Sequence, residues 1–66
     1  NRKNHEALYQ IAKLSDDYYK DKKIAYKEYK KYIENFYSRD EVISVFVERR
    51  IKEIKKEYFL EGELLD

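Results

Sequence analysis

The 66-residue sequence contains no cysteine, no proline and a single glycine. Without cysteine the chain forms no disulfide and offers no thiolate ligand to a metal ion. Its one histidine, His5, is too little for a zinc site of the ordinary kind, so we expect no metal site and no cofactor. The scarcity of glycine and proline disfavours β-hairpins and loop-rich folds, because tight turns depend on these residues.

The sequence also lacks a long apolar run. No stretch approaches the ~20 apolar residues of a membrane-spanning helix, and no signal peptide is evident. The chain starts in mid-sequence at Asn1 and contains no methionine. We therefore interpret residues 1–66 as one domain of a longer protein.

Positive and negative charges are nearly balanced in the sequence. Fifteen Lys and Arg residues face 14 Asp and Glu residues, for a net charge of +1, and this balance is not typical of a nucleic-acid-binding protein. Lysines are concentrated in residues 20–31, which predicts a solvated helix face, with weak binding of anionic lipid as the functional alternative. The six lysines are Lys20, Lys22, Lys23, Lys27, Lys30 and Lys31.

What the sequence does contain is helical periodicity. Apolar residues recur at steps of three and four, which predicts helices at residues 4–19, 22–37 and 39–64 and an all-α, antiparallel three-helix bundle. Asn4 and Asp21 are suitable N-caps for the first two helices. The expected core-facing residues of these two helices are Leu8, Ile11, Leu14, Ser15, Tyr18, Ala25, Tyr29, Tyr32, Ile33 and Phe36.

The third predicted helix has the clearest start. Ser38 and Glu41 have the spacing of a capping box, in which each side chain bonds the backbone of the other residue. The seam that follows consists of Ile43, Val47, Ile51, Ile54, Tyr58, Gly62 and Leu65. We expect Gly62 to lie inside this helix, where a small residue allows close helix packing. Further apolar residues, Val42, Phe46 and Phe59, indicate either a second bundle neighbour or an open groove for a partner helix.

Catalytic chemistry is not indicated. His5 has no second histidine or cysteine to act with, and we consider Ser15 and Ser38 as the candidate serine nucleophiles. No base oriented by a third group accompanies either serine, as a catalytic triad requires. Asp16 and Asp17 have the pattern of ordinary surface acids, and we expect the chain not to be an enzyme.

The end of the third helix carries a family resemblance. Residues 57–65, Glu-Tyr-Phe-Leu-Glu-Gly-Glu-Leu-Leu, resemble the closing pattern Glu/Gln-Tyr-Leu-x-Arg-Ala-Glu-x-Leu of MIT (microtubule interacting and trafficking) domains. Tyr58, Glu63 and Leu65 match this pattern, while Glu61 replaces its arginine and Gly62 its alanine. The spacing Ala25-xxx-Tyr29-xxx-Ile33 fits the second helix of the family, so the resemblance covers about residues 6–65.

The resemblance implies a non-catalytic binding module. MIT domains dock short tails of ESCRT filament subunits and recruit a parent ATPase, deubiquitinase, kinase or trafficking protein to endosomal or other membranes from the cytoplasm. One family site is a groove between the second and third helices that takes a helix with leucines and a basic residue. Carried over to this sequence, its third-helix side is Phe59 and Glu63, which are four residues apart and share a face. We place Tyr26, Ile33 and Tyr37 opposite them.

Other interpretations stay open. Residues 8–36 also fit one tetratricopeptide-like helical hairpin, which would bind a peptide together with neighbouring repeats. The last helix has a more distant similarity to that of KIX-type docking domains. A structural or dimerising helical spacer, whose surplus apolar surface is an oligomer interface, is the hypothesis without a peptide ligand.

Overall fold

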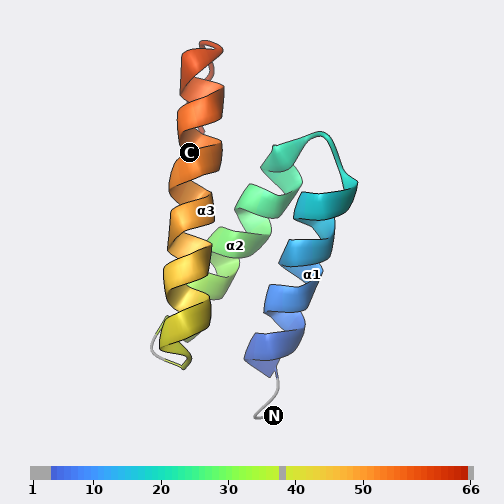
Figure 1. The fold of residues 1–66 in the computed structure, drawn as a ribbon, viewed down its shortest axis with the longest axis vertical. Coiled ribbons are helices and arrows are strands. Elements are labelled where there is room, and N and C mark those ends of the chain that lie inside the picture. The colour runs from blue at the N-terminus through green and yellow to red at the C-terminus, as the bar shows by residue number, and fades with distance from the viewer. Residues whose placement is uncertain (1–3, 38, 66) are drawn as a thin grey trace.

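The computed structural model describes residues 4–37 and 39–65 and contains three helices, α1 (Asn4–Tyr18), α2 (Lys22–Phe36) and α3 (Glu41–Leu60). Successive helices run in opposite directions, and α2 packs against both α1 and α3 (Figure 1). The described residues include no strand. The predicted all-α, antiparallel three-helix bundle is therefore confirmed. None of the three helices is long and apolar enough to cross a bilayer.

The start of α2 follows the prediction. Asp21 is its N-cap, and the carboxylate Oδ1 accepts a hydrogen bond from the backbone N–H of Lys23 at 3.0 Å. This bond satisfies one of the backbone donors left free in the first turn of a helix. The cap predicted at Asn4 concerns a side chain outside the described part of the structure, although α1 does begin at that residue.

The predicted start of α3 is wrong by two residues. Asp40 is the N-cap, its carboxylate accepts from the N–H of Ile43 at 3.2 Å, and the helix begins at Glu41. Asp40 provides an acceptor of the same kind as a serine hydroxyl, two residues further along the chain. Ser38, the predicted cap, lies outside the described residues.

The predicted end of α3 is also wrong, since the helix stops at Leu60 and not at Leu64. The N–H of Gly62 donates to the carbonyl of Phe59 at 2.9 Å, and the N–H of Glu63 donates to that of Tyr58 at 2.8 Å. These paired bonds form a Schellman motif, which requires a left-handed residue after the helix. Gly62 has φ +87°, and a Cβ added there would meet nothing within 4 Å. Its role is therefore conformational, and the expected close helix packing at this position is absent.

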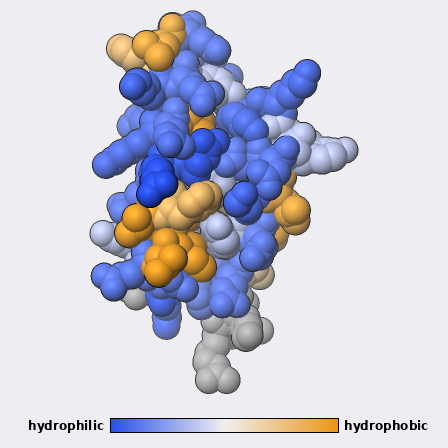
Figure 2. Space-filling model, viewed as in Figure 1, coloured by the Kyte–Doolittle hydropathy of each residue, from blue (hydrophilic) through white to orange (hydrophobic). Residues whose placement is uncertain are grey.

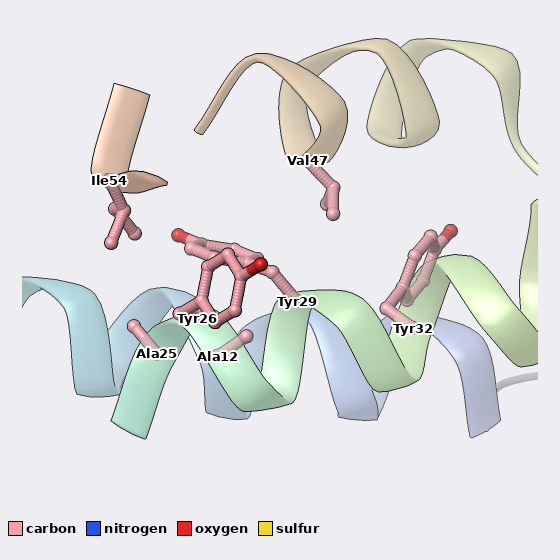
Figure 3. Packing of buried hydrophobic residues seen from close by; sticks show 7 residues of the cluster. All are labelled: Ala12, Ala25, Tyr26, Tyr29, Tyr32, Val47 and Ile54. Atoms are coloured by element: carbon pink, nitrogen blue, oxygen red, sulfur yellow. The ribbon is translucent and has the colours of Figure 1, made fainter. Parts of the chain in front are cut away.

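Tyrosines of α2 provide the largest buried side chains of the core. The predicted inner faces of α2 and α3 are confirmed, because Tyr29, Tyr32, Val47 and Ile54 are fully buried. Val47 and Ile54 point from α3 toward the tyrosine rings of α2 (Figure 3). The complete buried apolar cluster is Ala12, Ala25, Tyr26, Tyr29, Tyr32, Val47 and Ile54.

The predicted face of α1 is rotated relative to the observed one. Tyr18 is 81 % exposed and Ile11 and Leu14 are also exposed, whereas Ala12 is buried. Of the predicted residues, Ser15 is buried and Leu8 packs against the core. The bulky tyrosines of α2 fill the space between the helices, so small residues of α1 give the closer contact. The prediction from apolar spacing alone therefore placed too many of the large side chains of α1 in the core.

Candidate functional site

A polar cluster joins all three helices. Asp16 of α1 is 7 % exposed and accepts two hydrogen bonds from Arg50 of α3, from Nε to Oδ2 and from Nη2 to Oδ1, both at 2.8 Å. The hydroxyl of Tyr29 on α2 donates to Oδ2 at 2.8 Å. The Lys22 ammonium lies 3.5 Å from Oδ1. Together these residues, Asp16, Lys22, Tyr29 and Arg50, form what we call the Asp16 cluster.

The protonation states of the Asp16 cluster are fixed by its contacts. Burial raises the pKa of Asp16, but hydrogen bonds from Arg50 and Tyr29 and the charges of Arg50 and Lys22 lower it by more. The net result is a pKa below the ordinary value of an aspartate. Burial and the adjacent carboxylate raise the pKa of the Tyr29 hydroxyl. At neutral pH the carboxylate is thus ionised and fully engaged. It holds the helices together and is not a free base.

Sequence reasoning missed this cluster. Asp16 is not the surface acid that was predicted, because it is buried, while its neighbour Asp17 is exposed. A signal was present in the spacing. Asp16 lies four residues after the buried Ala12, and Arg50 lies four residues before the buried Ile54, so each charge falls on a core-facing row.

Phe59, the first predicted binding residue, is 63 % exposed in the last turn of α3. Leu60 and Leu64 are exposed beside it in the sequence. We call Phe59, Leu60 and Leu64 the C-terminal patch; Figure 2 shows apolar groups at the upper, C-terminal end of α3. A hollow of about 350 Å³ at this end is lined by Lys52, Lys55, Lys56, Phe59, Leu64 and Leu65.

Glu63, the second predicted binding residue, has an internal partner. Its carboxylate forms an ion pair with the ammonium of Lys23 on α2. The hydrogen bond to Glu63 raises the pKa of Lys23, and the same ammonium lies 5.7 Å from the centre of the Tyr58 ring. The Tyr58 hydroxyl accepts from the N–H of Lys22 at 3.0 Å and donates to Asp21 at 3.2 Å. Glu63 and Tyr58 therefore fasten the end of α3 to the start of α2.

The predicted α2 side of the groove does not assemble around Phe59. Tyr26 is only 4 % exposed and belongs to the core, and Ile33 is half-buried and packs against it. Tyr37 is exposed but follows the end of α2, where its carbonyl accepts from the hydroxyl of Ser44. Phe59 lies at the opposite end of α3, a helix of 20 residues and thus about 30 Å long. The hollow beside Phe59 is lined by lysines, and none of these three residues lines it.

The lysines of residues 20–31 do not form one free basic surface. Lys22 donates to the carbonyls of Asp16 and Tyr19, and Lys23 is paired with Glu63. The ammonium of Lys30 lies 5.8 Å from the centre of the Tyr26 ring. The other three, Lys20, Lys27 and Lys31, are exposed. Lipid binding by this segment stays a prediction.

A second apolar surface lies on the first half of α3. Val42 and Val45 are exposed, and with Phe46 they line a hollow of about 470 Å³ that is bordered by Glu41 and Arg49. We call these five residues the Val45 face. Figure 2 shows apolar groups over this lower part of α3, away from the C-terminal patch. The sequence had singled out Val42 and Phe46 as further apolar residues, but not Val45.

Comparisons with known proteins add no assignment, since no protein-family model, no curated protein and no solved structure matches the chain. Within residues 4–37 and 39–65, no group of three or more His, Asp or Glu side chains is placed to hold a metal ion.

Proposed function

We propose that this chain is a non-catalytic module that binds a short tail of another protein, with the C-terminal patch as its contact surface. The observation that carries the proposal is the exposure of Phe59, Leu60 and Leu64 at one end of α3, where Phe59 and Leu64 line the same hollow. Clustered exposed apolar residues on small proteins frequently mark interaction sites. The Schellman turn at Gly62 brings Leu64 and Leu65 to the same hollow as Phe59.

The chemistry of the hollow favours a particular ligand. Lys52, Lys55 and Lys56 border it, so an apolar tail with acidic residues is electrostatically complementary, whereas a basic tail is disfavoured. The resemblance to MIT domains implies a ligand whose basic residue meets Glu63, but Glu63 is already paired with Lys23. We therefore propose the acidic, leucine-containing tails of ESCRT filament subunits as the partner class, and recruitment of a parent protein as the role.

Titration of fluorescently labelled ESCRT tail peptides, followed by anisotropy, tests the proposal. We expect dissociation constants of about 10–100 µM, as is typical of small transient contacts. Phe59→Asp places a like charge before the acidic tail and removes the apolar anchor, so binding should weaken by at least about tenfold.

Leu14→Asp is the matched control, because Leu14 is an exposed leucine on α1, away from the patch. This variant should bind as the unmodified chain does. A tail that binds equally well to Phe59→Asp would contradict the assignment of the site. Absence of binding to every tail at about 1 mM would contradict the proposed function itself.

A further inference from the structure

The Val45 face is not used by the proposed function, and the aromatic ring at its base is held in place by its neighbours. The ring of Phe46 packs edge-on against Tyr9, with centroids 5.8 Å apart, and against Tyr29 at 6.4 Å. Val42 and Val45 stand beside it at 80 % and 58 % exposure. Burying two exposed valines and the free edge of a held ring releases water at little cost in side-chain entropy.

The charges at the border of this face have a particular symmetry. Glu41 lies four residues before Val45 and Arg49 lies four residues after it. Each charge is therefore about 6 Å along the helix axis from Val45, in opposite directions. Within the residues that the structure describes, neither Glu41 nor Arg49 forms an ion pair, so both are available to an incoming surface.

We propose that the Val45 face binds the same face of a second copy of this chain, with the two α3 helices antiparallel. In such a pair a two-fold axis passes beside Val45, and residues equidistant from Val45 lie opposite each other. Val45 then meets Val45, and Glu41 of each copy meets Arg49 of the other. The contact is apolar at its centre and closed at both ends by an ion pair.

The same charges argue against a parallel arrangement. A parallel pair would place Glu41 against Glu41 and Arg49 against Arg49, and like charges in apposition are unfavourable. The antiparallel contact covers little more than two turns of one helix per copy. The surface area that it buries is therefore below the roughly 1,200 Å² of stable complexes. We expect the dimer to form only at submillimolar or higher concentrations of the protein.

Sedimentation equilibrium from about 20 µM to about 2 mM measures this association. Glu41→Arg and Arg49→Glu each leave two repulsive pairs in the dimer, so each should weaken it by roughly tenfold. The double variant E41R/R49E restores both pairs with reversed sign and should return to within about twofold of the original constant. Circular dichroism establishes that each variant retains the helical fold.

Glu34→Arg is the control for charge reversal, because Glu34 is an exposed acid on α2; its dimer should be unchanged. A chain that stays monomeric at about 2 mM would overturn the proposal. A double variant that dimerises no more strongly than either single variant would also overturn it. Phe59→Asp should dimerise normally, since Phe59 lies at the other end of α3. Failure of the peptide assay and failure of dimerisation are therefore independent results.

Discussion

Where the three helices meet, the charged side chains of Asp16 and Arg50 are withdrawn from solvent, whereas at the two ends of α3 the apolar side chains of Val42 and Phe59 face it. The buried charges have complementary partners on neighbouring helices, and the exposed apolar groups have none within the bundle. Polar atoms thus orient the helices, whereas the binding that we propose would fall to apolar atoms at the two ends of α3.

The largest expected effect comes from breaking the Asp16 cluster. Arg50→Met removes both hydrogen bonds to Asp16 and leaves a carboxylate that is hardly exposed, so the free energy of unfolding should fall by about 2–3 kcal/mol. Urea denaturation monitored by circular dichroism measures this loss. Arg49→Met is the matched control, because Arg49 is exposed, and it should change stability by less than about 0.5 kcal/mol. Equal losses in the two variants would contradict the role given to Arg50.

The next effect separates two buried tyrosines of α2. Tyr29→Phe deletes a hydroxyl that donates to Asp16 at 2.8 Å and should cost about 1–2 kcal/mol, since a bond to a charged group is lost. The buried hydroxyl of Tyr32 has no hydrogen-bond partner among the described residues, so Tyr32→Phe should be neutral or slightly stabilising. Thermal unfolding of both variants decides the matter, and a larger loss in Tyr32→Phe would overturn this ranking.

These residues also show which parts of the structure can be predicted from sequence. The seam of α3 and the inner face of α2 follow from apolar periodicity, because Tyr29 and Val47 are large and regularly spaced. The face of α1 follows only in part, because Ser15 is buried as expected but Ala12 is buried where the larger Ile11 and Leu14 were expected. Spacing rules give a small residue such as Ala12 little weight, whereas the volume of the facing tyrosines favours it.

The site was only partly predictable for a related reason. Phe59 was expected either to meet a second bundle neighbour or to line an open groove, and its side chain is exposed. Its surroundings were not foreseen. The helix stops four residues earlier than expected, and Glu63 pairs with Lys23, forty residues away in sequence. Such long-range pairing depends on how the helices are arranged and leaves no local pattern.

Lowering the pH should weaken the Asp16 cluster selectively. The pKa of Asp16 is lower in the folded chain than the value of about 3.9 in an unfolded one, so its stabilising contribution is complete above that pH. The contribution is lost as the pH falls through the folded pKa, because protonation removes the charge that Arg50 binds. The difference in unfolding free energy between the original chain and Asp16→Asn should thus shrink between pH 5 and pH 2. A difference independent of pH would show that the carboxylate charge is not stabilising.

The smallest effect on stability is expected at the C-terminal patch. Phe59→Asp and Leu64→Ser alter side chains that lie mostly in solvent, so each should change the free energy of unfolding by less than about 0.5 kcal/mol. Val45→Ser should behave alike for the same reason. Chemical denaturation at about 10 µM protein, below the range in which the proposed dimer forms, isolates the stability of the single chain. A loss above about 1 kcal/mol would mean that the patch packs within the bundle in solution, and that the ends of α3 contribute to folding as the Asp16 cluster does.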